Sequence, residues 1–197
     1  EAPARRTVHV RRIDEVEKIA VAALAGVVVG DPQAPTTTTG PIANERQFQR
    51  VQALIDKGIS EGAKLVAGGT GRVEGMTRGY YAKPTIFSRA TNDMTIAREE
   101  IFGPVLTIIP YKTEEDAIHM ANDTVYGLSG YVYGGTVDRA RSVAKRLRTG
   151  MVHLNGAGVD PAAPFGGYKQ SGSGREWGAA GIDEFLETKA VMGSQAA

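Results

Sequence analysis

The sequence predicts an α/β domain in which a mostly parallel sheet is flanked by helices. Short segments rich in β-branched residues alternate along the chain with amphipathic helical segments. This alternation is typical of parallel strands joined by right-handed helical crossovers. At 197 residues the chain is long enough for one well-packed domain with a small appendage.

The first predicted elements are a strand over residues 6–10 and a helix over residues 13–26. The strand is rich in β-branched residues, and the helix places its apolar residues at helical spacing. A loop with three prolines fills residues 30–41, and a second helix covers residues 44–59. Asn44 can cap this second helix. Its apolar stripe consists of Phe48, Val51, Leu54, Ile55 and Ile59.

Three extended segments follow in the middle of the chain. Residues 63–69 read as a strand that ends in a glycine turn, and residues 80–87 as an extended piece that contains a proline. Residues 104–111 form a continuous apolar run, which is typical of a strand buried on both faces.

The rest of the predicted domain begins with a helix over residues 113–123. Thr113 can cap this helix, and Asp116 stands three residues later, as in a capping box. Further along the chain the pattern predicts a strand over 128–134, an amphipathic helix over 136–150 and a strand over 151–155.

Composition excludes several classes of function. Lysine and arginine total 23 and aspartate and glutamate 22, so the net charge is +1 and neither a nucleic-acid nor a membrane partner is expected. The absence of cysteine excludes a disulfide framework, a thiolate metal site and a cysteine nucleophile within these residues. No apolar run approaches the length of a membrane-spanning helix. The three histidines, His9, His119 and His153, lack metal-ligand spacing and are interpreted as structural, so no metal site is predicted.

Two loops are candidates for a ligand site, because ligands of such folds bind beyond the carboxyl ends of the strands. One is residues 98–104, where Glu99 and Glu100 precede the buried run and are either solvated charges or acids aimed into a cleft. The other is the glycine-rich loop, residues 155–178. Within it "SGSGREWG" is not a dinucleotide fingerprint, because Trp177 occupies the place of the third glycine.

Three motifs in one order carry a family resemblance. These are "EEIFGPVL", "ANDTVYGLSG" and "PFGGYKQSGSGRE", and together they resemble the carboxyl-terminal, catalytic-domain part of an NAD(P)-dependent aldehyde dehydrogenase. Weaker similarities extend over nearly the whole chain. The resemblance implies an aldehyde substrate and NAD or NADP as cofactor.

The resemblance also implies roles for five residues. Glu100 would bind the nicotinamide-side ribose and Phe102 would pack near the nicotinamide, although a solvated charge and a plain core aromatic are the alternatives. Phe165 would line the aldehyde tunnel and Val159 would belong to its variable wall. Glu176 would take part in a proton relay, and a salt bridge to Lys169 or Arg175 is the alternative reading.

The chain departs from the family pattern in what it lacks. The catalytic cysteine, the general-base glutamate and the amino-terminal cofactor domain would all lie upstream of residue 1. The first residue is Glu, as expected of a fragment or a processed product. The chain by itself is therefore expected to be inactive and to need the remaining part of a cytoplasmic enzyme. The alternative is a free-standing, non-catalytic assembly module.

The carboxyl-terminal tail is predicted to lie outside the catalytic-domain portion. Residues 1–183 form that portion, and residues 184–197 form an oligomerisation strand and tail. "EFLETKAVM" (184–192) is strand-like, and an exposed strand is a liability unless it is paired. The resemblance implies that it pairs with strands of another subunit in a homodimer or homotetramer; an ordinary edge strand is the alternative.

Overall fold

The structure is a computed structural model that describes residues 5–193. It divides into two compact units: unit 1 comprises residues 1–124 and unit 2 residues 125–197. In the described part of unit 2 no helix is long and apolar enough to cross a membrane, and the same holds for the described part of unit 1.

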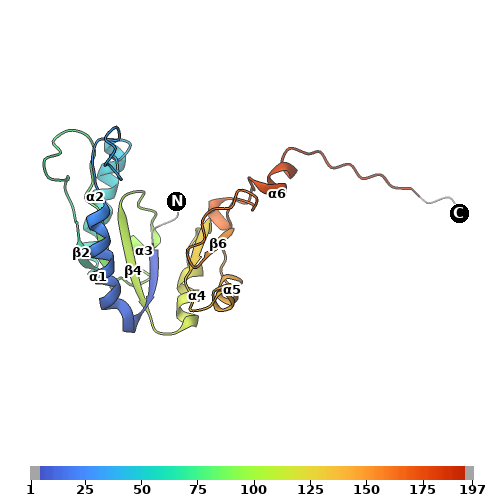
Figure 1. The fold of residues 1–197 in the computed structure, drawn as a ribbon, viewed down its shortest axis with the longest axis horizontal. Helices are drawn as coiled ribbons and strands as arrows, with labels where there is room; N and C mark the ends of the chain where they lie inside the picture. The colour runs from blue at the N-terminus through green and yellow to red at the C-terminus, as the bar shows by residue number, and fades with distance from the viewer. Residues whose placement is uncertain (1–4, 194–197) are drawn as a thin grey trace. The chain divides into compact units, whose positions relative to one another are not determined.

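The described strands of unit 1 form one four-stranded mixed sheet in the order β1-β4-β3-β2 (Figure 1). β1 and β3 both run parallel to β4, whereas β2 is antiparallel to β3. The prediction of a mostly parallel arrangement is therefore confirmed for this sheet. The bounds are β1 Arg5–His9, β2 Lys64–Ala67, β3 Thr85–Ser88 and β4 Val105–Tyr111.

Helices cover the sheet of unit 1 on both faces. β4 presents alternate side chains to two apolar clusters: Val105 and Ile109 pack with residues of α2 and α3, whereas Ile108 packs with Ile13 of α1. The central strand is thus buried on both faces, as its continuous apolar run predicts. The helices are α1 Ile13–Ala23, α2 Glu45–Ser60, α3 Thr95–Arg98 and α4 Glu114–Asn122, with short 3₁₀ turns at Val10–Arg12 and Leu24–Gly26.

Both helix starts predicted from capping residues are found in unit 1. The Asn44 side chain accepts a hydrogen bond of 2.9 Å from the Gln47 N–H at the start of α2. At α4, Thr113 Oγ1 accepts from the Asp116 N–H and the Asp116 carboxylate accepts from the Thr113 N–H, which completes the capping box.

Unit 2 contains a smaller β-structure. Its described strands β5 (Ser129–Val132) and β6 (Met151–Leu154) pair in parallel, with Ser129 opposite Met151. The connection between them contains α5 (Val137–Ala144), whose start is capped by Thr136. After β6 come a 3₁₀ turn at Lys169–Ser171 and the short helix α6 (Gly178–Asp183).

The structure corrects two of the element boundaries. The extended piece predicted at 80–87 becomes a strand only at Thr85, directly after Pro84, which has no N–H to donate to a ladder. The helix predicted over 136–150 ends at Ala144. The following residues turn back toward β6, where the Met151 N–H bonds to the Leu128 carbonyl.

The tail does not form the predicted strand within this chain. Residues 186–193 have no regular secondary structure, and the side chains of Phe185, Val191 and Met192 are 88%, 89% and 91% exposed. A strand that is completed by another subunit lacks its hydrogen-bond partners in a single chain. The edge-strand reading within the chain's own sheet is therefore wrong, and the assembly role stays a prediction.

Candidate functional site

The first candidate site is the loop at residues 99–103, which joins α3 to β4 in unit 1. Ile101 is buried, whereas the side chain of the next residue, Phe102, is 60% exposed. Phe102 also has a φ of 57°, in the left-handed region that residues other than glycine rarely adopt. A large aromatic held outward in a strained conformation is typical of a ligand-contact position rather than of a core residue.

Arg50 on α2 holds this loop from one side. Its Nη1 donates a hydrogen bond of 2.8 Å to the carbonyl of Glu100, and its Nη2 lies 3.0 Å from the Glu99 carboxylate. The two groups of one guanidinium thus hold two successive residues, as the planar fork of arginine allows. The Glu99 side chain is 52% exposed, so this acid is a partly solvated member of an ion pair.

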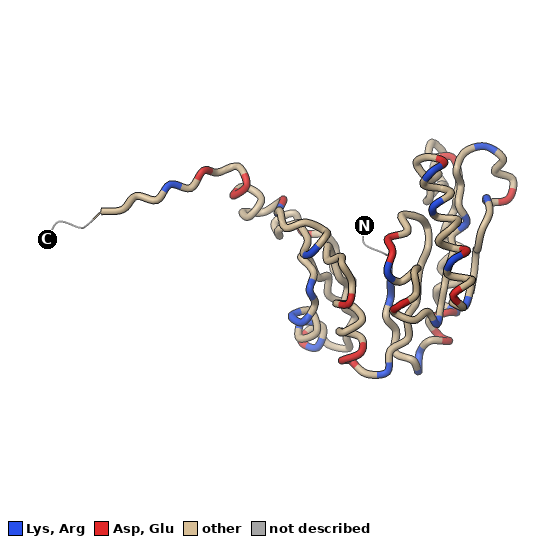
Figure 2. Tube along the Cα trace, turned by 180° about the vertical axis from the view of Figure 1, so that it is seen from behind, with Lys and Arg blue, Asp and Glu red and all other residues tan. Residues whose placement is uncertain are grey.

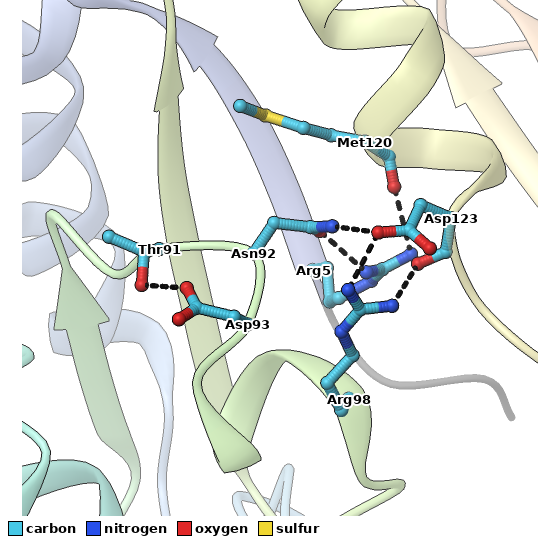
Figure 3. A network of polar contacts seen from close by, with 7 residues as sticks. All are labelled: Arg5, Thr91, Asn92, Asp93, Arg98, Met120 and Asp123. Atoms are coloured by element: carbon cyan, nitrogen blue, oxygen red, sulfur yellow. Dashed lines mark hydrogen bonds and ion pairs between the residues drawn. The ribbon is translucent and has the colours of Figure 1, made fainter.

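A second set of contacts holds the residues just before the loop. Arg98 Nη2 and Nη1 donate to the carboxylate and carbonyl of Asp123 at 2.6 and 2.9 Å (Figure 3). The same carboxylate accepts from Asn92 at 2.7 Å, and Arg5 donates to the Asn92 amide oxygen at 3.2 Å. The bond from Arg98 lowers the pKa of Asp123, and burial, with the positive charge of Arg98, lowers the pKa of Arg5.

Helix α3 is tied to the end of α2. The Glu61 carboxylate accepts from the backbone N–H of Thr95 at 2.7 Å and from its hydroxyl at 2.6 Å. These bonds lower the pKa of Glu61, so it is a charged acceptor at neutral pH. The four-residue helix is therefore held by side-chain contacts from outside, because one turn alone is not stable.

The second candidate site is the glycine-rich loop of unit 2, which brings two predicted residues together. Phe165 and Glu176 form a two-way backbone bridge in which each N–H donates to the other's carbonyl at 2.7 Å. The ring of Phe165 also contacts that of Trp177, with centroids 4.9 Å apart and planes inclined by 46°. Both rings and Glu176 line a hollow of about 680 Å³ that also touches Leu128 and Phe185.

Backbone groups and cations hold the glycine-rich loop in place. The carbonyl of Gly127 accepts from the N–H groups of Gly150 and Tyr168, and its own N–H donates to the Ser171 hydroxyl at 3.0 Å. Nη1 of Arg175 lies within hydrogen-bond distance of the carbonyls of Gly167, Ser173 and Gly174. The guanidinium groups of Arg148 and Arg175 each lie 5.6 Å from the centroid of the Tyr168 ring.

Val159 is not joined to Phe165 and Glu176. Its side chain is 65% exposed, and it is not among the residues that line the hollow. Arg175, one of the two salt-bridge partners considered for Glu176, has its Nη1 bonded to backbone carbonyls.

Histidine and acidic residues give no metal site within residues 5–193, where no group of three potential ligands lies close enough to hold an ion. His9 accepts from the Arg11 N–H and packs edge-on against Tyr111. His153 stacks on Tyr131 with ring centroids 4.6 Å apart. Figure 2 shows acidic and basic positions interspersed along unit 1.

Sequence reasoning missed the residues that hold both loops. Arg50 and Asp123 act through tertiary contacts, whereas Arg175 binds carbonyls of its own loop. The motifs contain no local signal for the contact between Arg50 and Glu100, which are 50 residues apart. The positive φ of Phe102 and Trp177 is likewise visible only in the structure.

Comparison with known proteins identifies the family. A sequence profile described as "Aldehyde dehydrogenase family" matches residues 2–191. The chain is 58% identical to 3-succinoylsemialdehyde-pyridine dehydrogenase from a Pseudomonas species, over 98% of this chain and 40% of that protein. The chain belongs to the aldehyde dehydrogenase family.

Solved structures agree in fold. A mutant of aldehyde dehydrogenase C from Pseudomonas syringae, complexed with NAD+ and octanal, is 57% identical and gives a TM-score of 0.93 over 96% of this chain and 39% of its own. A Mycobacterium tuberculosis aldehyde dehydrogenase complexed with NAD+ is 45% identical, with a TM-score of 0.91 over 98% of this chain and 40% of its own. The chain thus spans about 40% of the length of these relatives.

Proposed function

We propose that this chain supplies part of the catalytic machinery of an NAD(P)-dependent enzyme that oxidises an aldehyde to a carboxylic acid. The observation that carries the proposal is the 99–103 loop, where a strained, outward aromatic stands two residues from a carboxylate. Structures of two relatives with NAD+ support the cofactor class. A cytoplasmic location stays a prediction.

The residues of the 99–103 loop fit the nicotinamide half of a dinucleotide. Glu100 can accept hydrogen bonds from two vicinal ribose hydroxyls, and the exposed ring of Phe102 can restrict how far a nicotinamide ring swings. The bound dinucleotide supplies the hydride acceptor. Neither role needs Glu99, whose carboxylate is paired with Arg50.

Residues of unit 2 are assigned to the aldehyde side. Phe165 is proposed to line the aldehyde tunnel, and Val159 to belong to its variable wall. Glu176 is proposed as a proton-relay residue, which the backbone bridge to Phe165 holds next to the tunnel wall. Phe165→Ala in the full-length enzyme should raise KM for the aldehyde more than KM for NAD+, because only the aldehyde would touch that ring.

The nucleophile and the general base of this proposal lie outside the chain, which contains no cysteine. The 197-residue chain alone should therefore show no NAD(P)-dependent oxidation of octanal, measured as reduced cofactor at 340 nm. Turnover by the pure chain would contradict the proposal. The full-length protein that contains these residues is the positive control.

The competing reading is a non-catalytic assembly module. Intact-mass measurement of the protein from its source, with sequencing of whatever precedes Glu1, separates the two readings. A cysteine shortly before Glu1 supports the enzyme, whereas an initiator methionine directly before it supports the module.

Glu100 offers the direct test of the cofactor role. In the full-length enzyme Glu100→Gln keeps the shape of the side chain but weakens its charge-assisted bonds to ribose. Hydride transfer should slow about tenfold while KM for the aldehyde changes little, because the nicotinamide would be less well positioned. Pre-steady-state kinetics with an unchanged hydride step would return Glu100 to the class of solvated surface charges.

We also propose that the exposed tail builds a homodimer or homotetramer by pairing with another subunit. The side chains of Phe185, Val191 and Met192 are almost fully exposed in the single chain, which is typical of a segment that is covered on assembly. Deleting residues 184–197 from the full-length enzyme should give monomers or aggregates while the α/β core stays folded. Sedimentation tests this, and an unchanged oligomer would exclude the tail as the assembly strand.

A further inference from the structure

We propose that Arg50 and Asp123 are positioning residues that together fix the 99–103 loop, and through it Glu100, for hydride transfer. This inference rests on the proposed function, because it assumes that Glu100 and Phe102 meet the cofactor. Neither residue is assigned a contact with substrate or cofactor here. Each acts through the loop that it holds.

Arg50 grips the loop at its backbone. The 2.8 Å bond from Nη1 to the Glu100 carbonyl fixes the peptide that leads into Ile101 and Phe102. The ion pair with Glu99 orients the same guanidinium, which is 42% exposed and would otherwise exchange among rotamers. The residue that carries the proposed ribose-binding carboxylate is therefore held through its main chain.

The next residue of α2 fixes the far end of the loop. Val51 is fully buried, and a Cβ added to Gly103 would meet its two methyl groups at 2.8 and 2.9 Å. The loop thus lies directly against one turn of α2, with Arg50 at its start and Val51 at its end. Any shift of the loop relative to α2 would break both contacts.

Asp123 holds the same segment from the end of α4. Its carboxylate and carbonyl together receive both terminal nitrogens of Arg98, which immediately precedes Glu99 (Figure 3). Asn92 donates to the same carboxylate, so the position of Asp123 is itself fixed by a second partner. Arg98, the residue before the loop, is therefore held to the end of α4, and the loop itself is held to α2.

This arrangement connects two helices to the reacting end of the proposed cofactor site. Displacing a reacting group by about 1 Å is enough to slow a reaction up to a hundredfold. Loss of either contact should let the loop move while the other still restrains it. Loss of both contacts should release the loop. The rate of hydride transfer in the double variant should therefore fall by more than the product of the two single reductions.

The test uses the full-length enzyme and measures the hydride step directly. Arg50→Ala should raise KM for NAD+ and slow hydride transfer about tenfold, and Asp123→Asn, which keeps the shape but loses the charge, about threefold. The double variant should lose more than about thirtyfold. The primary isotope effect on kcat with aldehyde deuterated at C1 should rise in each variant, because hydride transfer becomes slower relative to the other steps. KM for the aldehyde should stay within about twofold.

Matched variants separate positioning from general stability. Arg50→Lys can still pair with Glu99 but cannot hold both partners with a planar fork, so it should restore only part of the rate. Arg12→Ala is the control, because it removes a similarly exposed ion pair between Arg12, which directly precedes α1, and Glu15 within α1. This variant should leave all kinetic constants unchanged.

The outcomes also separate this inference from the proposed function. If the unmodified full-length enzyme does not reduce NAD+ with any aldehyde, the proposed function fails. If it does, but the isotope effect and KM for NAD+ are unchanged in Arg50→Ala and Asp123→Asn, only the positioning role is overturned. A purely additive double variant would show that the two residues do not hold one common loop.

Discussion

Sixteen of the seventeen buried apolar residues in the described part of the chain lie in unit 1, and only Ala140 lies in unit 2. Unit 1 places helices against both faces of a central strand, which creates two apolar clusters. In unit 2 no residue of β5 or β6 is fully buried, and aromatic side chains such as Tyr131 and Tyr133 are 60% and 66% exposed. Backbone hydrogen bonds and arginine contacts take the place of a core there.

The difference indicates that hydrophobic burial stabilises unit 1 more than it stabilises unit 2. A two-stranded sheet is marginal on its own in water. The exposed aromatics and the apolar tail of unit 2 are the kind of surface that a further domain or subunit covers. The loop that is proposed to bind the cofactor lies in the unit with the larger apolar core, and the proposed tunnel and assembly residues lie in the other unit.

Separating the units should have the largest effect. Residues 1–124 alone should fold and unfold cooperatively in urea, because they retain both apolar clusters. Residues 125–197 alone should show no sigmoidal transition. Circular dichroism follows the first piece, and Trp177, the only tryptophan of the chain, reports on the second by fluorescence. A cooperative transition in the second piece would break the comparison.

Matched truncations of strand residues should differ between the units. Ile108→Ala on β4 removes a fully buried side chain and should cost about 2–5 kcal/mol of the free energy of unfolding. Val132→Ala on β5 removes a half-buried side chain and should cost about 1 kcal/mol. Urea unfolding of each variant measures both values, and equal losses would mean that β5 is better packed than its exposure indicates.

Acid should weaken unit 1 through Glu17 on α1. Burial alone would raise the pKa of Glu17, but the bond from Lys64 and the positive charge of Arg89 together bring it below the ordinary 4.5. A lowered pKa means that the stabilisation is present above pH 4.5 and is lost as the pH falls through the folded-state value. Glu17→Gln should cost about 2 kcal/mol at pH 7 and reduce the loss on acidification. Thermal melts from pH 7 to acid measure this loss in the unmodified protein and in Glu17→Gln. The same dependence of the melting temperature on pH in both proteins would exclude Glu17 as the cause.

Helix caps should give the smallest effects and sharpen the comparison. Thr113→Ala breaks the complete capping box of α4 and should cost about 1 kcal/mol. Thr136→Ala removes a single 3.2 Å bond at the start of α5 and should cost about half as much. Unfolding followed by circular dichroism and by tryptophan fluorescence in parallel assigns each loss to its unit. A larger loss in the second variant would reverse the expected order.

Patterns that depend on near neighbours predicted the fold well. The apolar stripe and cap of α2 and the doubly buried β4 follow from spacing along the sequence, and the structure contains both. The single-turn helix α3 has no such signal, because Glu61 supplies its contacts from 34 residues away. The sequence also did not indicate the division into two units, because alternating helices and strands look alike whether or not the strands share one sheet.

The candidate site divides along the same line. The motifs place Glu100 and Phe102 in one loop because they are only two residues apart in the sequence. The bridge between Phe165 and Glu176 follows from the path of the glycine-rich loop, which a list of its residues does not reveal. The outward position of Phe102 depends on the burial of Ile101 and on the close contact of Val51 with Gly103, where there is no room for a side chain. Both are properties of packing.

Gly127 has a consequence for the order in which the molecule forms during synthesis. Its N–H and carbonyl receive partners from Gly150, Tyr168 and Ser171, the last 44 residues further along the chain, and a Cβ at this position would lie 2.7 Å from the Arg148 carbonyl. On a ribosome, the bonds to Tyr168 and Ser171 can close only after those residues have left the exit tunnel. The two apolar clusters of unit 1 are complete much earlier. Nascent chains should therefore acquire protease resistance in two steps, with the second delayed until Ser171 has left the exit tunnel.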